Sequence, residues 1–400
     1  MAYTPPPEIL EKYAVVLVNF ALNSGEGLKS GEVVRLLANE SAKPLYVAVR
    51  NQILKSGGHP LTFYSPDNVS RQYFELASAD ELSFFPAKFM KGLVDQIDHS
   101  IAILSETDKH ELEGIDSVKI MAKAKAYKTS KDWLDKKENQ GKFTWTLALY
   151  GTPAMAAEAG LSEEDYWGQI IKACFLNLPD PIARWREVFA QNDDIRTKLN
   201  SLQISRLHVT GNGIDLGVTL GPGRKWLGGS GRNIPSFEIF TSPDWRGTTG
   251  HIEFNQPLYR YGNLITGIKL DFKNGLVVNS SADKSYDVLQ KMLEVKNADK
   301  IGEFSLTDKR LSPIDHFMAE TLCDENISAP FGNMHLALGS AYDDCYTGDL
   351  KKFTPALRTQ FGFNNSVIHT DIITTADRTV TAFLPDSSSR IIYQNGEFTI

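Results

Sequence analysis

The sequence predicts two domains of different class: an α/β domain over residues 1–200 and an α+β domain rich in antiparallel strands over residues 201–400. The chain has 400 residues, which is more than one hydrophobic core usually holds. Its first half alternates short apolar runs with amphipathic segments, which is typical of βαβ units around a parallel sheet. Its second half consists mainly of β runs joined by glycine-containing turns, which favours antiparallel hairpins.

In the first half, predicted strands and helices follow one another. The run "YAVVLVNF" at 13–20 has the composition of a buried strand, and "PLYVAVRNQILKSGG" at 44–58 that of an amphipathic helix closed by glycine. The polar, charged end of the last helix marks the predicted domain boundary. The same patterns predict further strands at 60–64, 100–105 and 142–153 and helices at 162–176 and 180–200.

The second half is predicted to be a series of β runs interrupted by one helix. In the segment 281–295, Val288, Leu289 and Met292 recur at helical spacing and predict this helix. Each predicted hairpin contains an Asn-Gly pair or another glycine between two strand-like runs. The hairpins are predicted at 202–220, 265–278 and 388–400.

The composition of the chain indicates which partners and which cellular compartment to expect. The net charge is −7 and no long basic stripe occurs, so nucleic acid is not expected as a main partner. No run approaches the roughly 18 uninterrupted apolar residues of a membrane span, and the N-terminus lacks a signal segment, so no membrane contact is expected. The three cysteines, Cys174, Cys323 and Cys345, lie far apart, which favours a reducing cytoplasm over a disulfide framework.

Several catalytic classes are disfavoured by missing motifs. The stretch "GPGRKWLGGSGRN" at 221–233 has glycines and bases that suggest a phosphate cradle, but it matches neither P-loop nor GxGxxG spacing. Turns between strands explain its glycines better. No GxSxG elbow for a serine hydrolase occurs. Cys323 and Cys345 are better explained as packing residues than as nucleophiles.

Histidines in apolar, strand-like runs are the first candidate site residues. In "NSVIHTDII", His369 and Asp371 are two residues apart, so they share one face of the predicted strand. Such a pair is a hydrogen-bonded surface pair, a catalytic dyad or two arms of a metal site, and spacing leaves all three open. His335 lies in a similar run, "MHLALGSAY".

Carboxylates in equally apolar surroundings are the second set of candidates. Glu238 lies within "IPSFEIFTSP", Glu303 within "IGEFSL" and Glu325 within "TLCDENISAP". A buried carboxylate costs free energy unless it is paired or binds a cation. Taken singly, Glu238 and Glu303 also fit outward positions of half-exposed strands, and Glu325 fits a solvated loop. Together with Asp371 these carboxylates carry four negative charges, which would balance two divalent cations, with the two histidines at the flanks, as in paired-metal hydrolases.

The second half also resembles the M29 family of metallo-aminopeptidases, the aminopeptidase T and aminopeptidase S group. Four blocks carry the resemblance in the family's order: "RKWLGGSGRNIPSFEIFTSPD", "IGEFSL", "TLCDEN" with "HLALGSAY", and "NNSVIHTDI". The first half is similar only through "GTPAMAAEAGLSEEDYW" and its α/β pattern. The resemblance implies a tyrosine at the site, Tyr342, and six metal ligands: Glu238, Glu303, Glu325, His335, His369 and Asp371.

The resemblance further implies a two-metal aminopeptidase that acts on short peptides and forms a homodimer. Two divalent ions (zinc, cobalt, manganese or magnesium) would activate a bridging water, Glu303 would shuttle its proton, and Tyr342 would hydrogen-bond the oxyanion. The loop 326–334 is longer than the corresponding link in the family. It favours, as an alternative, a metal-dependent hydrolase of another amide or ester on the same scaffold. A non-catalytic protein that binds metal or peptide is the third alternative.

Overall fold

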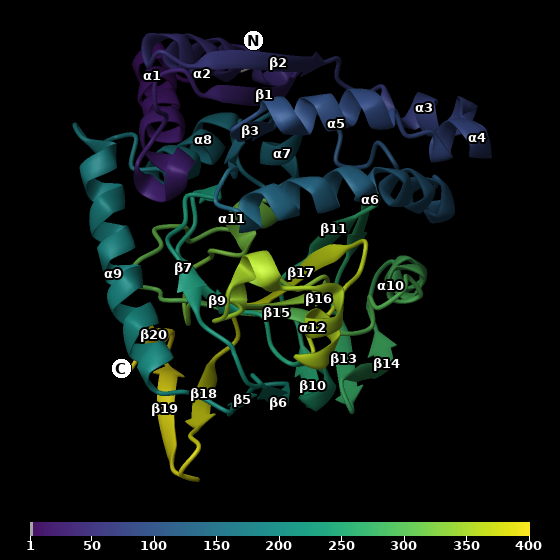
Figure 1. Cartoon of the computed structure of the whole chain (residues 1–400), viewed down its shortest axis with the longest axis vertical. Coiled ribbons are helices and arrows are strands. Elements are labelled where there is room, and N and C mark those ends of the chain that lie inside the picture. Colours follow the sequence, from purple (N-terminus) through teal and green to yellow (C-terminus); the bar gives the residue numbers. More distant parts are fainter. Residues whose placement is uncertain (1–2) are drawn as a thin grey trace. The chain divides into compact units, whose positions relative to one another are not determined.

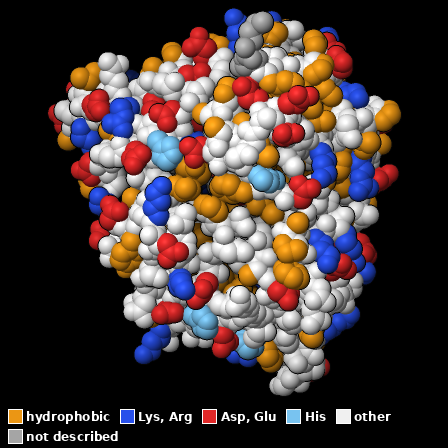
Figure 2. Space-filling view, turned by 180° about the vertical axis from the view of Figure 1, so that it is seen from behind, with side chains coloured by type: hydrophobic (Ala, Val, Ile, Leu, Met, Phe, Trp, Pro, Cys, Tyr) orange, Lys and Arg blue, Asp and Glu red, His pale blue; other side chains and the backbone are white. Residues whose placement is uncertain are grey.

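The computed structural model describes residues 3–400, and this part of the chain forms two compact units (Figure 1). No described helix is both long enough and apolar enough to cross a membrane. On the face shown in Figure 2, lysine and arginine side chains are scattered among aspartate and glutamate. The first unit consists of the chain up to Glu187, Ser230–Ser236 and Met318–Leu322, and the second of Val188–Gly229, Phe237–Phe317 and Cys323–Ile400.

The first unit is built on a five-stranded sheet with the strand order β2-β1-β3-β4-β8. Every neighbouring pair in it runs parallel, and helices connect β1 to β2, β2 to β3 and β3 to β4. The prediction of a parallel sheet is therefore confirmed. The strands are β1 (Val33–Asn39), β2 (His59–Ser65), β3 (His99–Leu104), β4 (Thr144–Leu149) and β8 (Asn233–Ile234).

The starts of the helices follow from side chains that satisfy their free N–H groups. Ser78 and Glu81 form a capping box at one helix, and the Asp116 carboxylate accepts from the N–H of Val118, at 2.9 Å, at another. Up to residue 201 the helices are α1 (Pro7–Val16), α2 (Lys43–Lys55), α3 (Ser70–Leu76), α4 (Ala79–Ser83), α5 (Ala87–Gln96), α6 (Ser117–Asn139), α7 (Pro153–Glu158), α8 (Glu163–Ala173) and α9 (Pro181–Ser201).

The prediction of a strand at 13–20 is wrong. This run forms the second half of α1 and a π-helical turn, Leu17–Ala21. Val16, Leu17 and Val18 are consecutive and all buried, so this helix is covered on several sides and its apolar residues show no amphipathic period. A short apolar run of this kind fits a buried helix as well as a buried strand, because periodicity alone does not separate them.

The second unit contains an eight-stranded antiparallel sheet with the order β14-β13-β10-β6-β5-β18-β19-β20. The predicted hairpins form its β5–β6, β13–β14 and β19–β20 pairs. The strands are β5 (Arg206–Gly211), β6 (Ile214–Thr219), β10 (Thr249–Glu253), β13 (Lys269–Lys273), β14 (Leu276–Ser281), β18 (Arg378–Phe383), β19 (Ser389–Gln394) and β20 (Glu397–Phe398).

A second antiparallel sheet of this unit, with the order β17-β16-β15-β9-β7, carries the candidate site residues. Every residue of β15 and β16 is buried, so this sheet forms the interior of the unit. Its strands are β7 (Leu227–Gly228), β9 (Glu238–Thr241), β15 (Ile301–Thr307), β16 (Asn333–Gly339) and β17 (His369–Thr374). The remaining elements are β11 (Leu258–Arg260), β12 (Asn263–Ile265), α10 (Tyr286–Leu293), α11 (Thr321–Asp324) and α12 (Pro355–Gln360).

Candidate metal centre

The predicted ligands on strands β15, β16 and β17 share one face of the buried sheet. In the strand register, Glu303 on β15 and Asp371 on β17 both lie opposite Ala337 on β16, the strand between them. Residues two apart on a strand share a face, so His335 and His369 lie on this face as well. The small side chain of Ala337 leaves the space between the two carboxylates open.

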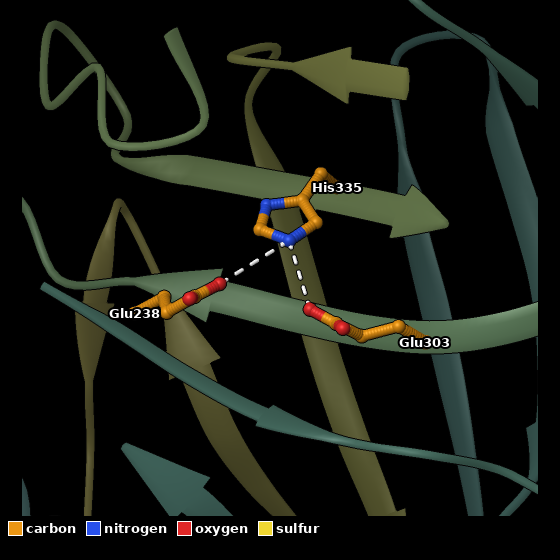
Figure 3. Close-up of side chains that lie close together, drawn as sticks. All are labelled: Glu238, Glu303 and His335. Atoms are coloured by element: carbon orange, nitrogen blue, oxygen red, sulfur yellow. Dashed lines mark hydrogen bonds and ion pairs between the residues drawn. The ribbon is translucent and has the colours of Figure 1, made fainter. Parts of the chain in front are cut away.

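His335 is the centre of one group of contacts (Figure 3). Its Nε2 lies 3.1 Å from Oε1 of Glu303 and 3.3 Å from Oε2 of Glu238, which begins β9. The Ser305 hydroxyl donates a 3.2 Å hydrogen bond to the same Oε2 of Glu238 and fixes that carboxylate. One ligand atom each from Glu238, Glu303 and His335 lies within 4.8 Å of the others, close enough to share a metal ion.

His369 is the centre of a second group of contacts. Its Nε2 lies 3.3 Å from Oδ1 of Asp371 and 3.5 Å from Oε2 of Glu303. Its Nδ1 lies 2.7 Å from the carbonyl oxygen of Ser340, so Nδ1 carries the hydrogen and Nε2 is left to face the carboxylates. Glu303 therefore presents one oxygen to each histidine.

Glu325 and Tyr342 lie at the margins of these contacts. Glu325 directly follows α11 and is 5% exposed, so it is not a solvated loop acid. Tyr342 lies just beyond β16, and its ring centroid is 4.9 Å from that of His369. Glu303, at 3% exposure, is likewise not the outward residue of a half-exposed strand. His369 and Asp371 are largely buried, which excludes the surface pair that their spacing left open.

Burial and crowding of like charges raise the pKa of two carboxyl groups in the cluster. For Glu303, burial outweighs the hydrogen bond from His335 and, together with the charge of Glu238, raises the pKa to about 7. For Glu325, burial and then the charges of Glu238 and Asp371 raise the pKa well above its usual value. The Thr307 hydroxyl donates to the backbone carbonyl of Glu325 at 3.4 Å, and Thr307 lies opposite Glu238 in the strand register, so Glu325 lies near the other carboxylates.

The pKa values of the two histidines and of Asp371 are shifted so that their charged forms are favoured. Burial lowers the pKa of His369, but Asp371 and Glu303 outweigh burial and raise it to about 9. The pKa of His335 rises well above its usual value because Glu238, Glu303 and Asp371 likewise outweigh burial. Burial raises the pKa of Asp371, but the two histidines outweigh burial and lower it to about 2. The cluster thus favours bound cationic charge.

The donor set fits divalent metal ions. Four carboxylates gather in the interior of one unit, and in the described part of the chain Glu303 and Asp371 pair with histidines alone. Four negative charges would balance two divalent ions, and mixed oxygen and imidazole nitrogen ligands suit zinc, cobalt and manganese. A buried cluster of carboxylates costs free energy unless cations occupy it.

Three features of the site were missed by the sequence analysis. The Ser305 hydroxyl that supports Glu238 lies two residues after Glu303 on the same face, a spacing that was available in the sequence. The Ser340 carbonyl that orients His369 is a backbone group, so its residue type carries no signal. The position of Ala337 between Glu303 and Asp371 depends on strand pairing, which no single segment shows.

Two histidines and four carboxylates, with five of these six residues on strands of one buried antiparallel sheet, form the donor set of a metal-dependent enzyme. Comparison with known families identifies the enzyme family. Residues 7–398 match the model of Peptidase M29, described as thermophilic metalloproteases, and the chain belongs to this family. The resemblance seen in the four sequence blocks is therefore confirmed.

Individual relatives agree with this assignment over their whole length. Aminopeptidase PepS of Streptococcus thermophilus is 28% identical, with 98% of each chain covered. Aminopeptidase T of Thermus thermophilus is also 28% identical, again with 98% of each chain covered. The solved structure of wild-type AmpT from Thermus thermophilus superposes with a TM-score of 0.83 at 25% identity, covering 98% of this chain and 99% of that one.

Proposed function

We propose that this chain is an aminopeptidase that uses two divalent metal ions, from among zinc, cobalt, manganese and magnesium, to release N-terminal residues from short peptides. The position of Glu303 supports this most directly, because its two carboxylate oxygens face the two histidines, one each. A carboxylate in that position suits a ligand shared by two ions, as in paired-metal hydrolases. The proposed ligands are Glu238, Glu303, Glu325, His335, His369 and Asp371.

We assign this centre to an α+β domain over 201–400 that follows an α/β domain over 1–200. In support, all six proposed ligands belong to the second compact unit, and five of them lie on strands of its buried antiparallel sheet. A sheet held by backbone hydrogen bonds fixes the distances between side chains on neighbouring strands better than loops do.

Bound divalent ions would supply a water of lowered pKa and would polarise the scissile carbonyl. Glu303 is the carboxylate proposed to pass a proton to the leaving amine, because it lies in the middle of the cluster, with one oxygen near each histidine. Tyr342, whose ring packs between His369 and Phe240, is proposed to donate a hydrogen bond to the oxyanion.

A homodimer and a cytoplasmic location complete the proposal. All three cysteines are buried, and Cys174 and Cys345 are free thiols, which is consistent with a reducing compartment. The homodimer is carried over from the family resemblance alone. Light scattering of the purified protein after gel filtration tests it, and a mass of one chain would contradict it.

The test of the activity is hydrolysis of leucyl and arginyl p-nitroanilide by the purified protein. We expect activity to disappear after chelation and to return when cobalt, zinc or magnesium is restored. N-acetylated leucyl p-nitroanilide should not be cleaved, because an aminopeptidase requires the free α-amino group.

Two glutamate variants show whether the activity belongs to this cluster. Glu303→Gln should abolish turnover, whereas Glu253→Gln should not, because Glu253 is an exposed residue paired with Lys269 on the other sheet. Activity that survives chelation would contradict the proposal. Metal-dependent cleavage of the acetylated compound or of other amides, without aminopeptidase activity, would favour the alternative hydrolase. Tight metal binding without any turnover would favour a binding protein.

A further inference from the structure

The segment from Ser340 to Asp343, which we call the Ser340 segment, follows β16 and supports two residues of the site. The carbonyl of Ser340 accepts the hydrogen bond from Nδ1 of His369. Two residues later, Tyr342 places its ring against the His369 ring at a centroid distance of 4.9 Å. The path of this segment therefore sets both the direction of the His369 Nε2 and the place of the Tyr342 phenol.

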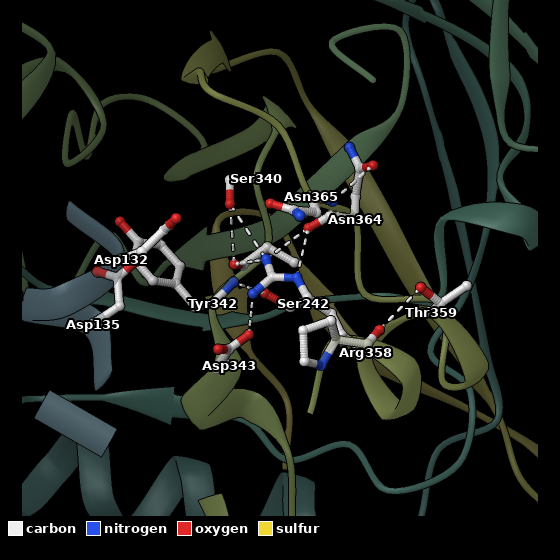
Figure 4. A network of polar contacts seen from close by, with 12 residues as sticks. Asp132, Asp135, Ser242, Ser340, Tyr342, Asp343, Arg358, Thr359, Asn364 and Asn365 are labelled. Carbon is white, nitrogen blue, oxygen red and sulfur yellow. Dashed lines mark hydrogen bonds and ion pairs between the residues drawn. The ribbon is translucent and has the colours of Figure 1, made fainter. Parts of the chain in front are cut away.

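Arg358, on the short helix α12, holds the Ser340 segment (Figure 4). Its guanidinium pairs with the carboxylate of Asp343 and donates to the carbonyl of Ala341 at 2.7 Å and to the hydroxyl of Ser340 at 3.3 Å. The same group donates to the carbonyl of Asn364 at 2.7 and 3.3 Å. One side chain thus ties the end of β16 to the segment that leads into β17.

The residues that Arg358 joins are themselves held by hydrogen bonds to other parts of the unit. The Asn364 side-chain amide donates to the carbonyls of Gly339 and Asn297, at 2.5 and 2.8 Å, and the backbone carbonyl of Asn364 accepts from the N–H of Ala341 at 3.0 Å. The N–H of Tyr342 donates to the Ser242 hydroxyl at 2.9 Å. The Arg358 guanidinium is therefore joined to a fixed frame, and its side chain is only 16% exposed.

Close packing beneath the segment leaves it little room to shift. A Cβ atom on Gly302, the residue before Glu303, would lie 2.4 Å from the carbonyl oxygen of Ser340. Glycine at this position therefore allows the carbonyl that orients His369 to approach the strand that carries Glu303. A small displacement of the Ser340 segment would move the oxygen away from His369 or press it against β15.

We propose that Arg358 is a positioning residue for the metal centre: through the Ser340 segment it fixes the orientation of His369 and the position of Tyr342. This inference rests on the proposed function for the role of those two residues. Arg358 is suited to the task because its planar guanidinium donates in several fixed directions at once, whereas a lysine ammonium acts as a single point charge. Supports of this kind typically change metal affinity or activity about 10- to 100-fold when removed.

The test compares Arg358→Lys with Arg310→Lys as a matched control. Arg310 also pairs with an aspartate, Asp308, and donates to a backbone carbonyl in the same unit, but it touches neither His369 nor the Ser340 segment. We expect Arg358→Lys to lower kcat about 10-fold or more, with little change in KM, while Arg310→Lys leaves kcat within about twofold. Equal kcat values for the two variants would overturn the proposal.

A mutant cycle separates positioning from general destabilisation. In a Tyr342→Phe background, Arg358→Lys should cost much less of the remaining kcat than it does in the wild type, because one of its targets is already lost. Fully independent effects of the two substitutions would contradict a path through Tyr342. The milder variant Asp343→Asn, which keeps the side-chain shape, should shift kcat in the same direction if Arg358→Lys proves too unstable to purify.

Cobalt binding gives a readout that does not depend on peptidase activity. Titration of the metal-free protein with Co²⁺, followed by visible absorbance, should show one of two sites weakened about 10-fold in Arg358→Lys and neither weakened in Arg310→Lys. If the wild type binds two cobalt ions but cleaves no peptide, the proposed function fails while this comparison still decides the role of Arg358. Unchanged affinity at both sites together with unchanged kcat would refute it.

Discussion

Ala337→Val tests the arrangement of the metal centre through a residue that is not itself a ligand. Ala337 is fully buried and lies opposite both Glu303 and Asp371 in the strand register. Directly opposed Cβ atoms in an antiparallel pair are about 4.5–5.5 Å apart, so two added methyl groups enter the space between the two carboxylates. Overpacking of this kind costs about 1–3 kcal/mol of the free energy of unfolding.

Ala382→Val is the matched control. Ala382 is also a fully buried alanine on an antiparallel strand, β18, but it belongs to the other sheet. Each kcal/mol lowers the melting temperature of a domain of about 150–250 residues by about 2–4 °C, so both variants should melt about 2–12 °C lower than the wild type. Only Ala337→Val should also lose metal.

Metal content after dialysis against zinc, measured by atomic emission, shows whether Ala337→Val has lost metal. We expect about two ions per chain for the wild type and for Ala382→Val, and fewer than one for Ala337→Val. If Ala337→Val retains two tightly bound ions and full activity, then Glu303 and Asp371 do not share a site across β16 and the reasoning from register is refuted.

Three other changes probe the same centre. The affinity of the metal-free protein for zinc should rise from pH 6 to pH 9, because His369, with a pKa of about 9, and Glu303, with a pKa of about 7, hold protons below those values that the ion must displace. Calorimetry in two buffers of different ionisation enthalpy measures the released protons, and no release at pH 7 would contradict the shifts. Ser305→Ala removes the hydrogen bond to Glu238 and should weaken one cobalt site by up to about 10-fold, whereas unchanged cobalt absorbance titrations would show that this bond does not orient the ligand. Tyr342→Phe should lower kcat about 10- to 1000-fold at nearly constant KM on leucyl p-nitroanilide, and a wild-type kcat would remove the phenol from the mechanism.

The chemical composition of the site could be predicted from the sequence because its residues violate local expectation. A carboxylate such as Glu303, between glycine and phenylalanine in an apolar strand, is expensive unless a cation or partner is present. His369 and Asp371 share a face for reasons of strand geometry alone. Such conflicts between local rules and residue type gather at functional sites, so they are visible without a fold.

Other parts of the molecule could not be predicted because their causes are non-local. The run at 13–20 is a helix because buried neighbours surround it, and its composition fits a strand equally well. The long helix α6 is largely polar, so it offers little apolar periodicity to detect. The Ser340 carbonyl and the Arg358 guanidinium act on His369 through the tertiary path of the backbone, which no pattern of letters shows.

The proposed metal centre holds two divalent ions with Glu303 between them. A crystal structure of the zinc-loaded protein, with anomalous differences collected at the zinc edge, would locate both ions. The expected result is two peaks about 3.5–4 Å apart, one near His335 and the other near His369, with an oxygen of Glu303 about 2.0–2.2 Å from each. A single peak, or two peaks that Glu303 does not join, would contradict a two-ion centre.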